Sequence, residues 1–338
     1  MKTINYARFI LVAVLCCAQL AVAQQRKSGL TGAAFLKVGV GAKAIGMGSA
    51  VTAATQDVNQ MFWNPAGIAL KDESMQASFS YNKWIADLGH NAAAVSYNWE
   101  GIGTIGIGFI QLGVTGIAAD RDIPLDPALI PFQVETNTTA TYDYSDIAMQ
   151  LSYGRYVIEN LSLGATLKYV TQTIDGQSVN AVAFDFGSVY HIGVMDWTIA
   201  ARFNNLGSDL KYYDIAFGLP LSFSIGMMLA PYSTDDSKLM LAIDAVKPQD
   251  GPQYFFSGAE FSFMNMISVR GGWKLNYSGT DDGGTTARNA INTTIEGLSA
   301  GASFATSMAG YNLRLDYAYT QMDLIDAAHR ITVSVGMK

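Results

Sequence analysis

Two short strings in this sequence have the residue types of enzyme motifs. Gly297 to Gly301, which reads GLSAG, matches the pattern that presents a serine nucleophile at a strand-to-helix turn. Gly101 to Gly106, which reads GIGTIG, matches the pattern that binds a dinucleotide phosphate where a strand leads into a helix. The first string lies inside a segment that alternates like a strand, and the second leads into one, so neither has the required helix. We interpret both as chance matches and predict that the protein is not an enzyme.

Candidate metal ligands are few. The histidines are far apart, and none has the partner four residues away that a helical zinc site needs: His90, His191 and His329. Asp281 and Asp282 precede two glycines, a combination that can bind calcium, although a hydrated loop is the simpler interpretation. We therefore predict no metal site and no cofactor.

A third group of candidate residues is ionic. Each member falls on the polar face of an alternating segment, and the set carries both signs: Lys168, Asp185, Arg202, Asp244, Glu260, Arg270, Lys274, Arg314 and Asp316. Such side chains either line a permeation path or form a salt-bridged filling in a narrow lumen, since buried charges need partners. The mixed signs favour the filling, because a selective path is expected to show a ring of one sign.

The elements that position these charges are strands. In 221–229 every odd residue is apolar, while Ser222, Ser224 and Gly226 lie opposite, and 267–276 repeats the pattern with basic residues on the polar face. Alternation and turn residues predict about fourteen strands. They lie near 74–83, 89–99, 103–113, 144–157, 160–173, 178–192, 195–205, 220–231, 237–247, 252–263, 266–276, 293–306, 310–320 and 329–338.

The predicted connections are of two kinds. Short ones lie at 100–102, 158–159, 193–194, 264–265 and 307–309, and long ones at 114–143, 206–219 and 277–292. Short periplasmic turns and long external loops are typical of an outer-membrane barrel, and an even number of strands places both ends of the chain on the periplasmic side.

The N-terminal residues 1–23 are typical of a secretory signal peptide, with positive Lys2 and Arg8, an apolar run and small residues before position 24. Both cysteines, Cys16 and Cys17, lie in this segment, and a lipoprotein anchor is the alternative interpretation. We expect the mature protein to have no disulfide and no thiol chemistry.

The composition fits a membrane barrel. After the signal there is no apolar run of about 18 residues, as a membrane-spanning helix requires. Half of the residues are hydrophobic and only 14% are charged, against about a quarter in typical soluble proteins. Without Lys2 and Arg8 the formal net charge changes from −7 to −9, which argues against a nucleic-acid partner.

Residues 24–73 are interpreted as a plug that belongs to the barrel of residues 74–338. The Gly-rich stretch 35–48 suits a backbone that packs closely on other backbone. Asp57 is expected to cap a short helical turn, which Asn64 and Pro65 end. Gly67 is expected to allow a sharp turn, and Trp63 to pack against the barrel wall. The plug motif comprises Gly46, Met47, Gly48, Asp57, Trp63, Asn64, Pro65, Ala66 and Gly67.

The sequence motif in residues 35–67 resembles that of the PorV/PorQ family of Bacteroidetes outer-membrane proteins, which are relatives of the FadL fatty-acid channels. The motif reads FLK-G-GA-A-GMG…D…WNPAG. The resemblance implies association with type IX secretion components or with the C-terminal domains of secreted cargo. In FadL-like channels the corresponding segment blocks or gates a passage for hydrophobic molecules. PorV members carry an ending NPAK, whereas this chain has Gly67, which favours the broad family over a cargo-shuttle role.

We therefore predict an all-β protein: a 14-stranded antiparallel transmembrane β-barrel of FadL-like type with an N-terminal plug. Its predicted location is the outer membrane of a Bacteroidetes-like Gram-negative cell, with outer-membrane lipid as a partner. The predicted function is an accessory role in type IX secretion or surface attachment. The alternative is a channel for hydrophobic small molecules, for which Met228, Met240, Phe256 and Val170 supply apolar positions on the inner face.

Overall fold

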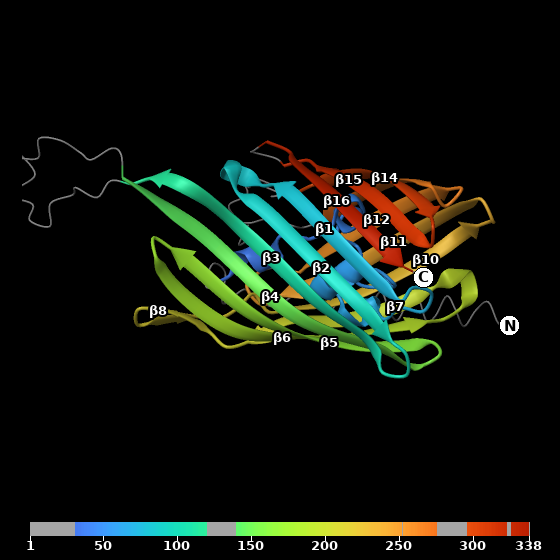
Figure 1. The fold of residues 1–338 in the computed structure, drawn as a ribbon, viewed down its shortest axis with the longest axis horizontal. Helices are drawn as coiled ribbons and strands as arrows, with labels where there is room; N and C mark the ends of the chain where they lie inside the picture. The colour runs from blue at the N-terminus through green and yellow to red at the C-terminus, as the bar shows by residue number, and fades with distance from the viewer. Residues whose placement is uncertain (1–30, 120–139, 252, 276–295, 323–325, 338) are drawn as a thin grey trace, which may run out of the picture.

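The computed structural model describes residues 31–119, 140–251, 253–275, 296–322 and 326–337. Within these ranges, fourteen antiparallel strands form one closed barrel, in which β7 pairs with β10 and β16 returns to pair with β1 (Figure 1). The barrel strands are β1 Met75–Lys83, β2 Gly89–Trp99, β3 Gly103–Ala118, β4 Thr141–Ile158, β5 Leu161–Ile174, β6 Gln177–His191, β7 Thr198–Gly207, β10 Ser222–Ser233, β11 Ser237–Pro248, β12 Tyr254–Phe263, β13 Ile267–Leu275, β14 Leu298–Met308, β15 Tyr311–Thr320 and β16 Ala328–Met337. The predicted fold class is confirmed.

Alternation along the strands separates two environments. Where β1 pairs with β16, Ser80 and Thr332 face each other and are buried, whereas the pair Phe79 and Val333 is exposed on the outside. The outer face is therefore apolar and the inner face polar. Closure leaves no unpaired strand edge in the barrel.

The structure differs from the expected strands at two loops. The predicted loop 114–143 contains the end of β3 and the start of β4, where a register shift between Val114 and Ile117 and a positive φ at Gly116 interrupt the alternation. The predicted loop 206–219 contains a small hairpin, β8 Leu210–Tyr212 and β9 Ile215–Phe217. The predicted strand 293–306 begins at Leu298, and residues 293–295 lie outside the described ranges. The signal peptide 1–23 and the pair Asp281–Asp282 also lie outside them.

The two ends of the barrel differ. The short-turn end carries the turns 100–102, 159–160, 234–236, 264–266 and 309–310, together with the paired residues Met75 and Met337. The long-loop end is the opposite one, and there β3 to β6 extend well beyond the other strands (Figure 1).

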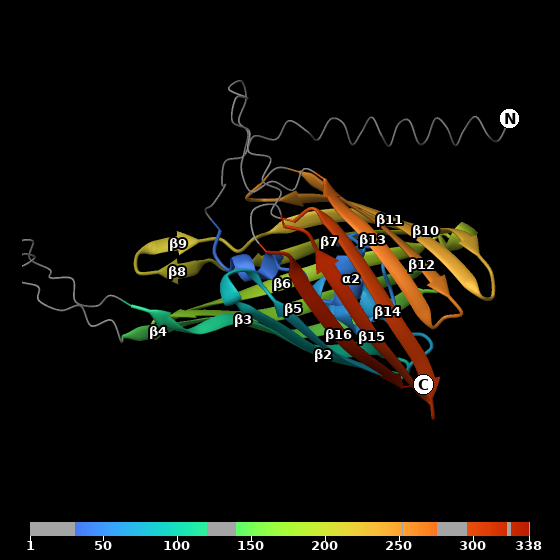
Figure 2. The same ribbon diagram turned by 90° about the horizontal axis from the view of Figure 1, so that it is seen from above.

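Residues 31–73, which we call the plug, lie inside the barrel (Figure 2). The plug contains η2 Ala34–Lys37, α2 Ala42–Gly46, η3 Val58–Phe62 and η4 Pro65–Ile68. The segment α2 contacts β13 to β16, η3 contacts β1 to β3, and η4 contacts β4 to β6. The amide of Ala42 donates to Thr332 Oγ1 at 2.8 Å, and Thr332 Oγ1 donates to Ser80 Oγ at 3.0 Å. The plug thus contacts the seam between the first and last strands. No helix within the described ranges is long and apolar enough to cross a membrane.

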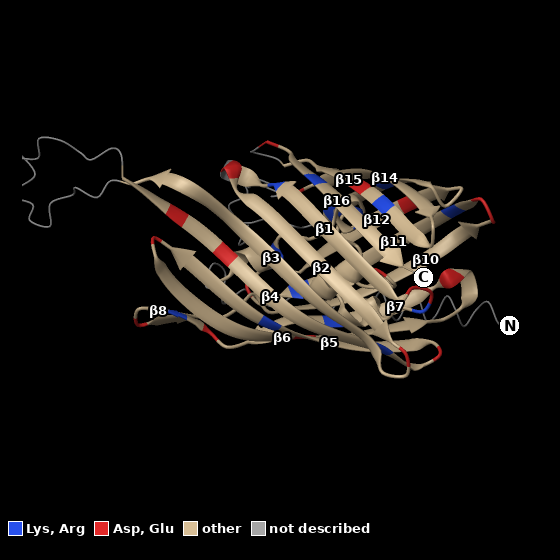
Figure 3. Cartoon of the chain, in the orientation of Figure 1, with Lys and Arg blue, Asp and Glu red and all other residues tan. Residues whose placement is uncertain are grey.

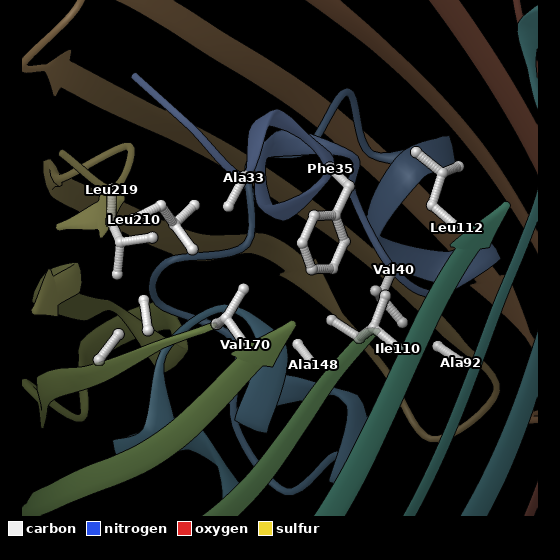
Figure 4. Packing of buried hydrophobic residues seen from close by; sticks show 12 residues of the cluster. Ala33, Phe35, Val40, Ala92, Ile110, Leu112, Ala148, Val170, Leu210 and Leu219 are labelled. Carbon is white, nitrogen blue, oxygen red and sulfur yellow. The ribbon is translucent and has the colours of Figure 1, made fainter. Parts of the chain in front are cut away.

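The plug supplies three of the twelve buried residues of an apolar core at the long-loop end. Phe35 and Val40 of the plug pack with Ile110, Leu112 and Val170 of β3 and β5 (Figure 4). Because these wall residues face inward, side chains of both the plug and the barrel wall fill the lumen here.

Candidate functional site

The plug meets the wall through backbone contacts at two places. The first uses the predicted motif residues Gly46, Met47 and Gly48, the last of which has φ +62°. A Cβ added to Gly258 of β12 would lie 2.9 Å from the carbonyl carbon of Met47, and one added to Gly272 of β13 would overlap Gly48. Glycine on both sides therefore allows plug and wall backbones to touch.

The second place uses Asn64, Pro65 and Ala66. They lie against glycines of three adjacent strands, Gly154 of β4, Gly164 of β5 and Gly187 of β6. A Cβ added to Gly154 would lie 2.9 Å from Pro65 O, and one added to Gly164 or Gly187 would overlap Pro65 or Asn64. Both halves of the plug motif thus match a glycine patch on the wall.

Asn64 is fully buried and makes the polar contacts of this second place. Its Nδ2 donates to Thr52 O at 2.7 Å and to Ser188 O at 3.3 Å, while its Oδ1 accepts from the amide of Ala66 at 3.2 Å and caps η4. The residue therefore joins two plug segments to β6.

Two further motif residues pack within the plug. Gly67 was expected to allow a sharp turn, but its φ is negative, and its lack of a side chain serves a close approach in which a Cβ would lie 2.5 Å from Ala54 O. Trp63 is buried, its indole Nε1 donates to Val40 O at 2.9 Å, and its ring also packs in one apolar cluster with Val246 and Phe256 of the wall.

Asp57 has a double role. Its Oδ1 accepts from the amide of Asn59 at 2.9 Å and caps η3, as expected, while its Oδ2 lies 2.9 Å from Arg314 Nη2 and 4.0 Å from Lys43 Nζ. Burial acts to raise the pKa of Asp57, but the charges of Arg314 and Lys43 and the amide of Asn59 outweigh it and hold the pKa well below its usual range. The plug is thus fastened electrostatically to β15.

Seven of the nine predicted inward charges belong to one network and two separate ion pairs inside the barrel, and Figure 3 marks the charged positions along the strands. In the network, Arg270 pairs with Glu260 and, at 2.8 Å, with Asp316, and Asp316 also lies 2.8 Å from Arg314. Through Arg314 this network continues to Asp57 in the plug.

The first of the two separate pairs joins β5 and β6. Lys168 Nζ lies 2.6 Å from Asp185 Oδ2, and Asp185 also accepts from the amide of Asn205 at 2.8 Å. The second separate pair, Lys274 with Glu296, starts from β13, the strand that also carries Arg270. These pairings describe a salt-bridged filling rather than a ring of one sign.

Asp244 holds the plug by a different means. Its Oδ2 accepts from the amide of Val51 at 3.0 Å, the amide of Thr52 at 2.9 Å and Thr52 Oγ1 at 2.7 Å. We call the segment Val51–Thr52 with Asp244 the septum. A Cβ added to Gly226 of β10 would lie 2.7 Å from Thr52 Cβ, so the septum is tightly packed against the wall.

Arg202 is the exception among the inward charges. It is 6% exposed, and no residue in the described ranges accepts a hydrogen bond from it or pairs with it. Its guanidinium carbon lies 5.3 Å from the centre of the Trp63 ring.

Two cavities lie on either side of the septum. The inner cavity, of about 400 Å³, lies toward the short-turn end and is lined by Met47, Val51 and Ala53 of the plug and by Met228 and Met240 of the wall. Two of the apolar inward residues singled out from the sequence therefore meet in this cavity.

The outer cavity, of about 80 Å³, lies toward the long-loop end. It is lined by Trp63 of the plug and by Arg202, Ser222, Val246 and Phe256 of the wall. The fourth apolar residue, Val170, instead belongs to the core around Phe35.

The septum separates these cavities. On β10, Ser222 lines the outer cavity, Met228 lines the inner cavity, and Gly226 lies between them. On β11, Val246 lines the outer cavity, Met240 lines the inner cavity, and Asp244 lies between them. Sequence reasoning placed Asp244 on the inner face but missed Thr52, since a threonine in a Gly/Ala-rich stretch carries no signal of its own. It also missed Glu296, which closes the ion pair of Lys274.

Comparison of the structure with solved structures finds similar proteins, whereas comparison of the sequence finds none. No family model matches the sequence, and no curated protein matches it. The chain is similar to the toluene transporter TbuX of Ralstonia pickettii, with a TM-score of 0.57 and 14% identity over 88% of this chain and 97% of that one. It is similar to the toluene transporter TodX of Pseudomonas putida, with a TM-score of 0.53 and 9% identity over 93% and 99%.

A FadL homologue of Pseudomonas aeruginosa matches with a TM-score of 0.49 and 11% identity over 88% of this chain and 98% of that one. At such identities the likeness concerns the fold alone. The fold shared with TbuX and TodX agrees with the observed 14-stranded closed barrel, while membership of the PorV/PorQ family stays a prediction.

Proposed function

We propose that the protein is an outer-membrane channel for hydrophobic small molecules, closed in this state by the septum. The observation that carries the proposal is the pair of cavities that face opposite ends of the barrel and are separated by one hydrogen-bonded segment, Val51–Thr52 on Asp244. Moving this segment joins the cavities along β10 and β11. The named substrates of the similar transporters, toluene in both cases, agree with a hydrophobic cargo.

The outer face supports a location in a lipid bilayer. Large apolar side chains are exposed around the whole circumference, among them Ile107, Leu151, Trp273 and Val333. Exposed apolar area of this extent on a barrel is stabilised by lipid and not by water.

Uptake in whole cells tests the channel. A Gram-negative host that expresses the full chain is expected to take up radiolabelled toluene faster than the same host with an empty vector, and the protein is expected in the outer-membrane fraction. Met240→Trp fills the inner cavity and is expected to remove the gain. Leu241→Trp, whose side chain faces outward from the next position of β11, is the matched control and is expected to keep it. Equal uptake by all four strains would refute the proposal.

A role in type IX secretion is the second candidate function, and it rests on the resemblance of the plug motif to that of the PorV/PorQ family. Gly46 to Gly48 and Asn64 to Ala66 contact wall glycines, a docking role that any plugged barrel can use. Gentle detergent extraction followed by identification of copurifying proteins discriminates the two candidates. Recovery of secretion components favours the second, and a monomer carrying apolar small molecules favours the channel.

A further inference from the structure

We propose that the outer cavity is a binding site for small aromatic carboxylates, with Arg202 as the group that binds the carboxylate. The inference rests on the proposed channel function and names a ligand class for it that differs from neutral hydrocarbons.

The first argument is the unmatched charge of Arg202. The side chain is buried, its Nε is fully enclosed, and no described residue accepts from its guanidinium. The carboxylates of Asp244 and Asp185 both act on its charge without bonding it: Asp185 is bonded to Lys168 and Asn205, and Asp244 bonds the septum through Oδ2, while its buried Oδ1 has no hydrogen-bond partner in the described part of the chain. A buried guanidinium without an acceptor is strongly unfavourable, and a bidentate carboxylate satisfies it.

The second argument is the sign of the cavity. Every charged side chain that lines it, within the described part of the chain, is basic: Lys37, Lys168, Arg202 and Lys274. The carboxylates that pair with the three lysines lie behind them and do not line the cavity. The field in the cavity therefore favours an anion, and Arg202 is the one of these four cations that has no carboxylate partner of its own among the described residues.

The third argument is the aromatic wall. Trp63 lies beside the guanidinium, and the rings of Tyr254 and Phe256 lie 5.1 Å apart, tilted by 39°. An aromatic ligand can place its carboxylate on Arg202 while its ring packs in an offset or edge-to-face manner against these side chains.

Size restricts the ligand further. The cavity measures about 80 Å³, whereas a cavity of roughly 150 Å³ holds benzene. The cavity as it stands is therefore too small for a ring, so even a single-ring ligand requires the side chains that line the cavity to move, and a long acyl chain requires a larger displacement.

Calorimetric titration of the detergent-solubilised full chain tests the site with 4-methylbenzoate, toluene and decanoate. The first two probes share a ring and differ by the carboxylate. We expect 4-methylbenzoate to bind at least tenfold more tightly than toluene and than decanoate. R202M is expected to remove this preference, and R202K to retain part of it. R155M, which alters an outward-facing arginine of β4, is the matched control and is expected to behave like the natural chain.

The comparison of ligands on the unaltered chain decides the proposal even if a variant fails to fold. Equal binding of toluene and 4-methylbenzoate, or tighter binding of decanoate, overturns it, as does R202M with unchanged 4-methylbenzoate affinity. Failure of the channel proposal has a different signature, since the carboxylate then binds in detergent although cells show no gain in toluene uptake.

Discussion

Substitution of Asp244 by alanine is predicted to open the septum. The change removes the one acceptor shared by the amides of Val51 and Thr52 and the hydroxyl of Thr52, at 3.0, 2.9 and 2.7 Å. A hydrogen bond to a charged group contributes roughly 1.5–3 kcal/mol. Since the three bonds are not additive, we count two at the lower value, which gives about 3 kcal/mol. At about 1.4 kcal/mol per factor of ten, the open population is expected to rise about a hundredfold.

The assay is the open probability of single channels in planar bilayers. A graded series strengthens it: D244N keeps a neutral acceptor and is expected to fall between the natural chain and D244A, and T52V removes one bond, with a rise of about tenfold. The matched control is D146A, which removes a buried carboxylate that accepts from Tyr144 and Gln172, away from the septum. If D244A opens no more often than the natural chain, or if D146A opens equally often, the septum is not the gate.

Three further predictions concern how the plug is held. G272A is expected to lower the temperature at which the folded barrel unfolds on a heat-modifiability gel, because its Cβ would overlap Gly48; G271A, whose Cβ meets nothing within 4 Å, is expected to leave that temperature unchanged. N64A is expected to destabilise the protein by about 1–3 kcal/mol in denaturant titrations, because it leaves the buried Thr52 carbonyl without its donor; an unchanged midpoint would contradict this. Because the pKa of Asp57 is lowered in the folded protein, the stability from its pairing is present above about pH 3.9 and is lost as the pH falls through the lowered pKa. In acid titrations followed by tryptophan fluorescence, R314M is expected to move the transition to higher pH; a transition that does not move would show that Arg314 does not set it.

The strands could be predicted from the sequence because each has enough residues to show period-two alternation. The hairpin β8–β9 could not, since strands of three residues contain too little pattern. The same limit applies beyond Val114, where a register shift reverses the alternation within β3.

The candidate site was predictable in part. Alternation places Arg270 and Asp316 on the inner face, but their contact joins β13 to β15 across β14, and that distance depends on the closure of the whole barrel. The partners of the plug motif were not predictable, because Gly164 and Gly187 look like ordinary strand glycines until the plug lies against them. The missing acceptor of Arg202 is likewise a property of three-dimensional neighbours.

The contact between Ala42 and Thr332 has a consequence for the order of folding. The two residues are 290 positions apart, and Thr332 also bonds Ser80 of the first strand. The plug lacks this contact until β16, the last strand, is in place beside β1. Because such long-range pairing is slow, docking of the plug and closure of the cylinder become one late, shared step. A chain truncated before β16 is then expected to lose protection of the plug against proteolysis as well as barrel closure.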